Sequence, residues 1–330
     1  MRAAFIETRG GPEALKVGPR PDPKPGPNDV LIRVRASSLD RLDIYSREGS
    51  HGVMRQLPYI GGRDIAGDIL EIGSEARSAY PDLAVGQPVV ALGAGAHAEV
   101  ATAPAMLTFA LPPTCDYTAA AAIPTAGRSA YDALVNRARI QAGEDVLVVA
   151  GGSGVGSFGI QIARAAGCRV ITTVGGPGKF ELASRLGAEP INHYEENVAE
   201  RVRALTGGRG VDVVLDHVGA PMWEAAFKSL ADGGRFVTTG VTAGHMAQIH
   251  LGQLFTRGLE LHGVGRPDDA RLRRIMLGLL RLVANGQVAP VVHAVLPLSE
   301  IANGHRMLEA SSFFGKIVIR MDEEAGAPAS

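Results

Sequence analysis

Residues 145–156 read DVLVVAGGSGVG, and this stretch decides the fold that we expect. The run Asp145–Ala150 is apolar after its first residue and lacks polar alternation, which predicts a strand buried on both faces of a sheet. A glycine-rich turn follows, and Gly154–Ala166 then reads as a helix closed by Gly167. Backbone N–H groups at the start of such a helix are donors for a phosphate group. The strand, loop and helix together predict that this chain binds a dinucleotide.

The glycine-rich loop fits the phosphate-binding pattern in two registers. One frame, G-x-G-x-x-G, runs from Gly151 to Gly156 and places Ser153 where the second glycine would stand. The other frame, G-x-G-x-G, begins at Gly152. A purely structural turn is the alternative to a phosphate site, because glycine-rich turns are common. The residues expected to contact the phosphates are Gly151, Gly152, Ser153, Gly154, Val155 and Gly156.

Helical and strand patterns alternate downstream of the loop as far as residue 264. The expected strands are 169–174, 190–192, 211–215, 235–239 and 259–264, and the expected helices are 179–186, 198–206 and 222–230. Apolar strands separated by helices are typical of a parallel sheet that is covered on both faces. We therefore predict an α/β domain of the doubly wound type.

The rest of the sequence predicts a second, β-rich domain made from both ends of the chain. Residues 30–35 alternate as a half-buried strand does, and residues 65–72 and 88–92 are further short apolar runs. An alanine-rich helix is expected at 116–134. After residue 264 we expect helices at 270–284 and 299–309, strands at 291–296 and 316–320, and a frayed end at 322–330. The last strand must pair in a sheet, and we expect it to rejoin the N-terminal domain, which makes the doubly wound domain an insertion.

The composition argues against several other classes of protein. The chain has 330 residues, of which 46% are hydrophobic and 20% charged, as in an ordinary globular protein. A formal net charge of −1 without a basic run argues against nucleic-acid binding. Cys115 and Cys168 are too few for a disulfide framework or a four-cysteine zinc site. No apolar stretch is long enough to cross a membrane and residues 1–9 lack a signal-peptide core, so we expect a cytoplasmic protein.

The end of the expected strand 169–174 indicates which nicotinamide coenzyme binds. Chains that bind NAD place Asp or Glu there, where the carboxylate accepts a hydrogen bond from the ribose 2′-OH. Here Gly175 follows the strand, no carboxylate is present, and Lys179 comes soon after. We therefore predict NADPH, with Lys179 on the 2′-phosphate and Tyr194 as a further contact. The alternatives are that Lys179 opens the next helix on its solvated face and that Tyr194 is an ordinary surface residue.

Six motifs, spread over essentially the whole chain, resemble those of one family. They are DIYSREG at 43–49, GRDIAG at 62–67, AAIPTAG at 121–127, GGRGVDVVLD at 207–216, GGR at 233–235 and FGKIV at 314–318. In this order they resemble the medium-chain dehydrogenase/reductase family and, within it, the zinc-free, quinone oxidoreductase-like (zeta-crystallin-like) branch. The resemblance implies a GroES-like β-rich domain with an inserted Rossmann domain. We place the GroES-like domain at 1–122 and 266–330 and the Rossmann domain at 123–265.

The sequence departs from the zinc-dependent members of this family at their metal ligands. Those members place Cys at the position of Asp40 and His-Glu at Arg63 and Asp64, and their third ligand falls near Thr125. Arginine cannot ligate a metal and no soft ligand is present, so we predict no catalytic zinc. We also hypothesise an ion pair between Asp40 and Arg63 at the vacated position. The alternative is that both side chains reach solvent separately.

The resemblance implies hydride transfer from NADPH to a quinone or an α,β-unsaturated carbonyl compound. Tyr45 is the candidate hydrogen-bond donor to the carbonyl oxygen of the acceptor, with a merely packed tyrosine as the alternative. Asp40, Arg63 and Thr125 complete the candidate catalytic set, and Thr125 is also expected to contact the nicotinamide portion of the coenzyme. The other coenzyme contacts that the resemblance implies are Val218, Gly240, Val241, Gly263, Val264 and, from the last strand, Lys316.

Two other functions fit the same residues. One is a 2-enoyl thioester reductase of the same family, and the other is an NADPH-binding sensor or scaffold with little turnover. The resemblance also implies a homodimer formed through the strand at 259–264. The expected partners are thus a small-molecule acceptor and a second copy of the chain, with no nucleic acid and no membrane.

Overall fold

The computed structural model describes residues 1–321, so the frayed end expected at 322–330 lies outside the described residues. The chain forms two compact units. Unit 1 consists of Met1–Thr125, Asp269–Met276 and the chain from Pro290 onward, and unit 2 consists of Ala126–Asp268 and Leu277–Ala289. Unit 2 is an insertion in unit 1. The expected return to the first domain at residue 266 is too early for residues 277–289, which belong to unit 2.

Unit 2 is built on a six-stranded sheet in which every neighbouring pair of strands is parallel. The strand order is β11-β10-β9-β12-β13-β14. The strands are β9 (Asp145–Val148), β10 (Arg169–Val174), β11 (Ala188–Asn192), β12 (Val211–Asp216), β13 (Leu230–Thr238) and β14 (Glu260–Gly263). The order runs outward in both directions from β9 and β12, as in dinucleotide-binding sheets. Leu147 and Val214 on these central strands are fully buried, which explains the absence of polar alternation.

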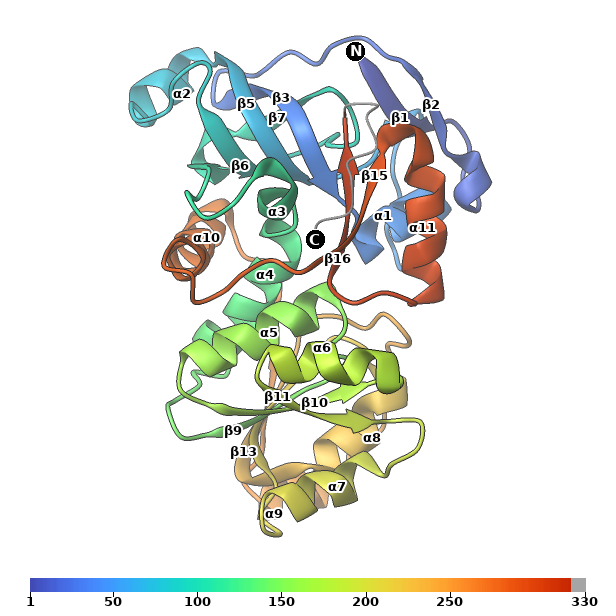
Figure 1. Ribbon diagram of the computed structural model, residues 1–330, viewed down its shortest axis with the longest axis vertical. Helices are drawn as coiled ribbons and strands as arrows, with labels where there is room; N and C mark the ends of the chain where they lie inside the picture. Colours follow the sequence, from blue (N-terminus) through green and yellow to red (C-terminus); the bar gives the residue numbers. More distant parts are fainter. Residues whose placement is uncertain (322–330) are drawn as a thin grey trace. The chain divides into compact units, whose positions relative to one another are not determined.

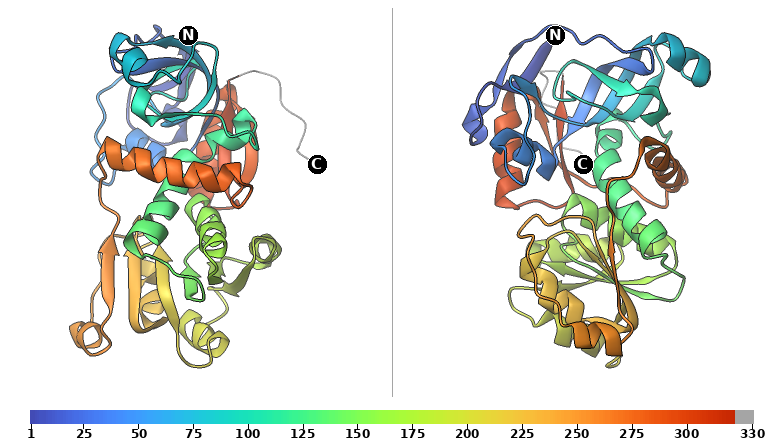
Figure 2. Two further views of the ribbon diagram at one scale, coloured as in Figure 1. Left: turned by 90° about the vertical axis from the view of Figure 1, so that its left-hand side faces the viewer. Right: turned by 180° about the vertical axis from the view of Figure 1, so that it is seen from behind.

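Helices cover both faces of this sheet. They are α5 (Gly154–Ala165), α6 (Phe180–Arg185), α7 (Val198–Leu205), α8 (Ala220–Lys228) and α9 (Leu251–Thr256). Figures 1 and 2 show α5 and α6 on one face of the sheet and α7 and α8 on the other. Part of the core under α8 is aromatic, because the Trp223 ring lies 5.1 Å from the Phe227 ring and 4.8 Å from the Phe236 ring.

Unit 1 contains two sheets. One has the order β15-β16-β3-β5-β6-β8, with β7 paired to β3, and the other has the order β2-β1-β4. The strands are β1 (Arg2–Ile6), β2 (Lys16–Pro19), β3 (Asp29–Ser38), β4 (Tyr59–Ile60), β5 (Asp64–Ile72), β6 (Pro88–Leu92), β7 (Val100–Pro104), β8 (Thr108–Ala110), β15 (Val292–Pro297) and β16 (Lys316–Arg320). As Figure 1 shows, β16 lies beside β3, with which it pairs antiparallel. The predicted return of the last strand to the N-terminal domain is confirmed.

The helices of unit 1 are short apart from those near the C-terminus. They are α1 (Arg41–Glu48), α2 (Ser74–Ala79), α3 (Tyr117–Ala121) and α11 (Ile301–Ala310), while α4 (Pro124–Tyr131) and α10 (Asp269–Ala284) cross from one unit to the other in sequence. The single helix expected at 116–134 is wrong, because α3 ends at Ala121 and Pro124 starts a new helix. A proline lacks the N–H that continues a helix. Within residues 1–321, every helix is too short or too polar to span a lipid bilayer.

Candidate functional site

The glycine-rich loop of unit 2 connects β9 to α5. Ser153 is the N-cap of α5, and its hydroxyl oxygen accepts a hydrogen bond from the Gly156 N–H at 2.9 Å. The same oxygen lies 2.9 Å from the Ala150 carbonyl and 2.8 Å from His217 Nε2. The side chain that replaces the second glycine of the pattern therefore caps the helix and ties the loop to the end of β12.

Three amides of this loop point to a phosphate ligand. Among the described residues, the N–H groups of Gly152, Gly154 and Val155 have no hydrogen-bond acceptor. The first N–H groups of a helix have no acceptor within the helix and need one from outside it. Together with the helix dipole, such open donors form a site for an anion. The loop therefore fits the pyrophosphate of a dinucleotide.

Two glycines of the loop are required by close backbone and side-chain contacts. A Cβ on Gly151 would lie 2.2 Å from Thr172 Oγ1 on β10. A Cβ on Gly156 would lie 2.3 Å from the Ala150 carbonyl oxygen, which is backbone and cannot move aside. Gly156 closes both frames, whereas Gly151 belongs only to the G-x-G-x-x-G frame, so the tight packing at Gly151 favours that register.

The loops after β10 and β11 bring Lys179 and Tyr194 to one region. A Cβ on Gly175, which directly follows β10, would lie 3.0 Å from Tyr194 Cε2. The Tyr194 side chain is exposed, and its ring lies 4.3 Å from the ring of His193. Burial lowers the pKa of His193, and the nearby charge of Lys179 lowers it further. The region therefore combines a cation with two flat rings, and residues 170–180 contain no carboxylate.

The remaining coenzyme candidates of unit 2 follow the carboxyl ends of the other strands. Val218 follows β12, Gly240 and Val241 follow β13, and Gly263 and Val264 lie at the end of β14. A Cβ on Gly240 would lie 3.1 Å from the His217 carbonyl oxygen, and the Val241 side chain is exposed. In contrast, the Val264 side chain is buried. Every predicted coenzyme contact in unit 2 thus belongs to the edge at which dinucleotides bind such sheets.

Asp216, at the end of β12, is a functional candidate that the sequence analysis did not single out. Its carboxylate accepts hydrogen bonds from the N–H groups of Val218 at 3.1 Å and Gly219 at 3.0 Å. Burial raises the pKa of Asp216 to about 6, even though these bonds lower it. The buried carboxylate fixes the loop that carries Val218. Its only signal in the sequence was its place at the end of an apolar strand.

Two candidate residues of unit 1, Asp40 and Thr125, belong to a network around the buried side chain of a third, Lys316. The Lys316 ammonium donates hydrogen bonds to the Leu39 carbonyl at 2.9 Å and to Asp40 Oδ1 at 2.5 Å. It also lies 3.6 Å from Asp64 Oδ2. Asp64 Oδ1 accepts from the Thr125 hydroxyl at 2.6 Å and from its N–H at 3.0 Å, and Oδ2 accepts from the Ser38 hydroxyl at 2.9 Å. We call these residues the Lys316 network: Ser38, Asp40, Asp64, Thr125 and Lys316.

The hypothesised ion pair between Asp40 and Arg63 is wrong. Asp40 pairs with Lys316, and the Arg63 side chain makes no ion pair or hydrogen bond within residues 1–321. Arg63 directly precedes Asp64, the first residue of β5, and adjacent residues of an extended chain point to opposite sides. Since Asp64 points into the Lys316 network, Arg63 points away from it. The Lys316 ammonium is held by carboxylates of unit 1, and its expected contact with the coenzyme stays a prediction.

The charges of the Lys316 network are coupled. Burial and the neighbouring carboxylates of Asp64 and Asp43 raise the pKa of Asp40 to about 8, although Lys316 lowers it. Burial alone would lower the pKa of Lys316, but the carboxylates of Asp40 and Asp64 raise it. Lys316 therefore keeps its charge at neutral pH, and Asp40 is the group in this network whose protonation is most easily changed.

Helix α1 carries Tyr45, and the side chain of Asp43 on the same helix fixes its N-terminal end. The Asp43 carboxylate accepts hydrogen bonds from the N–H groups of Asp40 at 2.8 Å and Gly62 at 3.0 Å. Burial would raise the pKa of Asp43, but His97, whose Nε2 lies 3.6 Å from Oδ1, contributes to lowering it to about 2. The half-buried Tyr45 ring stacks on His51 at 4.0 Å, and its phenol has no hydrogen-bond partner within residues 1–321. A free hydroxyl on a fixed helix agrees with a donor role, and the packed ring also agrees with the alternative.

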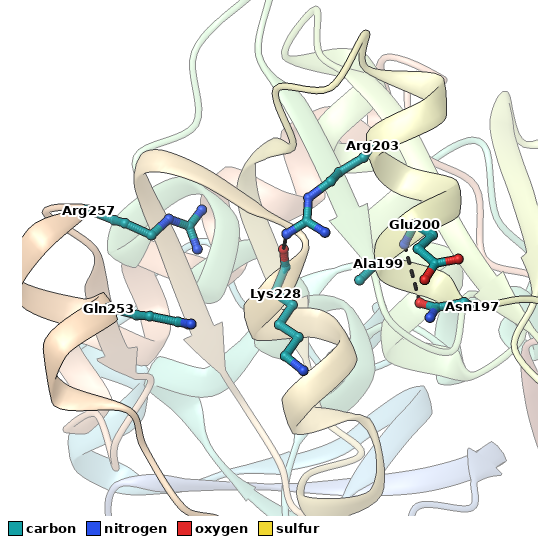
Figure 3. A pocket seen from close by; sticks show the side chains of 7 residues that line it. All are labelled: Asn197, Ala199, Glu200, Arg203, Lys228, Gln253 and Arg257. Carbon is teal, nitrogen blue, oxygen red and sulfur yellow. Dashed lines mark hydrogen bonds between the residues drawn. The ribbon is translucent and has the colours of Figure 1, made fainter.

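A separate pocket of unit 2, drawn in Figure 3, contains none of the predicted site residues. Its volume is about 470 Å³, and it is lined by Asn197, Ala199, Glu200, Arg203, Lys228, Gln253 and Arg257. The Arg203 guanidinium donates to the Lys228 carbonyl at 3.0 Å, and Arg257 donates to Asp232 at 2.8 Å. These cations already have partners, and the glycine-rich loop is not part of the pocket lining.

The parallel sheet and its phosphate loop define a dinucleotide-binding unit inserted in a β-rich unit, which is the architecture of a class of oxidoreductases. A family model described as a zinc-binding dehydrogenase matches residues 154–282, and one described as an alcohol dehydrogenase GroES-like domain matches residues 26–113. A quinone oxidoreductase of Pseudomonas aeruginosa is 33% identical over 94% of this chain and 96% of its own length.

Solved structures agree with this likeness. An NAD-dependent alcohol dehydrogenase is 34% identical with a TM-score of 0.88, over 98% of this chain and 100% of that one. A mycobacterial protein in complex with NADPH is 31% identical with a TM-score of 0.88, over 97% of this chain and 100% of that one. The chain belongs to the medium-chain dehydrogenase/reductase family and is quinone oxidoreductase-like. The resemblance read from the six motifs and the predicted fold class are confirmed.

The residues of unit 1 do not fit the zinc ion that the matched family description implies. The donors at the positions of the zinc ligands are Asp40, Arg63 and Thr125, of which arginine cannot ligate. No group of three or more His, Cys, Asp or Glu side chains within residues 1–321 is arranged to hold a metal. The Lys316 ammonium lies between the carboxylates of Asp40 and Asp64, where a second cation would be repelled.

Proposed function

We propose that this chain is an NADPH-dependent reductase that transfers a hydride to a quinone or an α,β-unsaturated carbonyl compound without a catalytic zinc ion. The observation that carries the proposal is the carboxyl edge of the sheet in unit 2. Open amides of the phosphate loop and the cation Lys179 lie there, and the acidic residue that would select NAD is absent. The P. aeruginosa and mycobacterial relatives support the same activity and coenzyme.

Each unit has its own part in this function. In unit 2 the amides of Gly152, Gly154 and Val155 bind the pyrophosphate, and Lys179 binds the 2′-phosphate. When bound, NADPH supplies the hydride. In unit 1 the Tyr45 phenol donates a hydrogen bond to the carbonyl oxygen of the acceptor, which stabilises the negative charge that develops there. Thr125, bonded to Asp64 through both its N–H and its hydroxyl, is held in one position by the Lys316 network.

The absence of a usable zinc set limits the chemistry to reduction of electron-poor acceptors. A zinc ion polarises an alcohol or carbonyl as a Lewis acid, and Asp40, Arg63 and Thr125 cannot hold one. Quinones and conjugated carbonyls need less activation by a Lewis acid, because the charge left by hydride addition is delocalised within the acceptor. Hydrogen-bond donors of the chain are then sufficient.

The coenzyme assignment is tested by titrating NADPH and NADH into the wild type and Lys179→Ala. Because a charge-assisted contact is lost, the binding free energy of NADPH becomes weaker by about 1–3 kcal/mol in Lys179→Ala, and that of NADH is nearly unchanged. Lys24→Ala, at an exposed lysine of unit 1, is the matched control and keeps both affinities. Equal affinity of the wild type for the two coenzymes would overturn the assignment.

The acceptor class is tested by NADPH consumption with 1,4-benzoquinone, 9,10-phenanthrenequinone and crotonyl thioester. The proposal expects turnover with the quinones. Preference for the thioester would instead support an enoyl thioester reductase. NADPH binding without turnover on any acceptor would support the sensor or scaffold.

We also propose that two copies pair through β14. This strand is the edge of the six-stranded sheet, and Leu261 on it is exposed. An unpaired edge strand with an exposed apolar residue is a surface that proteins usually cover. A monomer in sedimentation at micromolar concentration would contradict the pairing.

A further inference from the structure

We propose that Asp40 is the acid that protonates the reduced acceptor, and that Lys316 and Asp64 hold its carboxyl group in place. This inference rests on the proposed reductase function. Hydride addition brings two electrons and one hydrogen to the acceptor and leaves a negative charge on it, as an enolate or a hydroquinone anion. The Asp40 O–H bond then breaks, its proton forms the new bond of the product, and the carboxylate that remains is reprotonated by water.

The geometry gives Asp40 a fixed position. It is the N-cap residue of α1, and its N–H is bonded to the Asp43 carboxylate at 2.8 Å. Its Oδ1 accepts from Lys316 at 2.5 Å, so a proton on the carboxyl group is carried by Oδ2. The first contact fixes the backbone of Asp40 and the second orients its carboxyl group.

Asp40 is also the accessible carboxyl group of the Lys316 network. Its side chain is 17% exposed, whereas Lys316 is 4% exposed and Asp64 is completely buried. Lys316 and Asp64 therefore act through Asp40 and are positioning residues, while Asp40 is able to meet a ligand. Thr125 is partly exposed, but its hydroxyl is already donated to Asp64.

The distribution of hydrogen bonds decides which carboxyl group carries a proton. Asp64 accepts from Ser38 and twice from Thr125, and Asp43 accepts from two backbone amides. Both therefore act as carboxylates, and the pKa of Asp43 is lowered to about 2. The charged groups that face Asp40 are Lys316 from β16, Asp64 from β5 and Asp43 from α1. Two carboxylates against one ammonium favour a neutral, protonated Asp40, in agreement with its raised pKa of about 8.

After the proton has left, Lys316 compensates the new charge. Its ammonium is bonded to Asp40 Oδ1, and it is the cation that lowers the pKa of Asp40. The new charge on Asp40 is thus in direct contact with the ammonium, which it shares with the Asp64 carboxylate. Tyr45 is less suited to this step, because burial raises the pKa of its phenol, and it remains a hydrogen-bond donor.

The inference is tested with Asp40→Asn, which keeps an oxygen for Lys316 and removes the acidic proton. Loss of a positioned general acid lowers kcat with benzoquinone or an enone by about 100-fold. In the wild type kcat falls as pH rises through about 8, because the acid loses its proton, and this fall is absent in Asp40→Asn. Asp82→Asn, at an exposed carboxylate of unit 1, keeps the rate and the pH dependence of the wild type.

Two further readouts do not depend on the rate. The NADPH dissociation constant is unchanged in Asp40→Asn. Difference infrared spectra of the wild type between neutral and strongly alkaline buffer show the loss of a protonated carboxyl C=O stretch, and Asp40→Asn lacks this band.

A third test uses the pH dependence of the rate. In Lys316→Met the pH at which kcat falls moves upward, because the cation that lowers the pKa of Asp40 is gone.

The outcomes separate this inference from the function on which it rests. A wild type that oxidises NADPH, with Asp40→Asn showing the same rate and the same fall with pH, overturns the role of Asp40 alone. An infrared band that persists in Asp40→Asn does the same. A wild type that oxidises NADPH with none of the acceptors overturns the proposed function.

Discussion

The carboxyl edge of the sheet in unit 2 and the Lys316 network of unit 1 are built in opposite ways. The edge in unit 2 is made largely of backbone, with open amides at Gly152, Gly154 and Val155. The network in unit 1 is made of side chains from segments far apart in sequence, since Asp40 and Lys316 are separated by 276 residues. A backbone site depends on local conformation and glycine, whereas a side-chain network depends on charge balance.

This difference predicts how substitutions damage each region. A substitution in the loop acts through steric overlap and distorts the phosphate site. A substitution in the network leaves a buried charge without its partner, which is among the most destabilising changes in a protein. The following variants test that contrast, beginning with the largest effect.

Lys316→Met removes the ammonium that lies beside the Asp40 carboxyl group and the completely buried Asp64 carboxylate. Breaking a buried pair in this way lowers the free energy of unfolding by about 3–5 kcal/mol. Chemical denaturation measures the loss. The double variant Lys316→Met/Asp64→Asn recovers part of it, because the completely buried carboxylate is then replaced by a neutral group. A loss that is no smaller in the double variant would show that charge balance does not govern the network.

Gly156→Ala adds a Cβ that would lie 2.3 Å from the Ala150 carbonyl oxygen. The overlap with backbone lowers the free energy of unfolding by about 1–3 kcal/mol and weakens NADPH by distorting the loop. Gly18→Ala is the matched control, since the nearest atom to its added Cβ is Phe5 Cε1 at 3.8 Å. If Gly156→Ala binds NADPH as the wild type does, the backbone account of the loop is wrong.

Tyr45→Phe tests an effect that is confined to turnover, the loss of one hydrogen bond from unit 1 to the acceptor. A hydrogen bond to a charged oxygen is worth about 1.5–3 kcal/mol, so kcat with benzoquinone drops by about tenfold or more. The NADPH dissociation constant and the free energy of unfolding stay near wild-type values, because the phenol has no partner within residues 1–321. Unchanged turnover would favour the alternative in which Tyr45 only packs on His51.

Local patterns predicted most of unit 2. Strand β10 has the predicted bounds 169–174, and α5 begins at the predicted Gly154. Strand β9 is shorter than predicted and ends at Val148, because Ala150 adopts a positive φ of 55° where the chain turns into the loop. Buried strands and capped helices have short periods and end signals, so a single sequence is enough to place them.

The same reasoning was weaker in unit 1. Helix α1 has only eight residues and was not predicted, although the motif at 43–49 lies on it. The partner of Asp40 was predicted as Arg63, because both residues occupy positions of zinc ligands in the zinc-dependent members of the family. Lys316 became the partner because β16 pairs with β3 and begins beside the residues that lead into α1. Such a pairing depends on tertiary structure and leaves no periodic signal in the sequence.

The central claim is that this chain reduces an organic acceptor with NADPH and without a metal. The most direct measurement is NADPH oxidation with 1,4-benzoquinone by protein dialysed against a strong chelator, with its zinc content determined by elemental analysis. We expect zinc far below one atom per chain and turnover equal to that of untreated protein. Turnover that disappears on dialysis and returns when zinc is added would contradict the account.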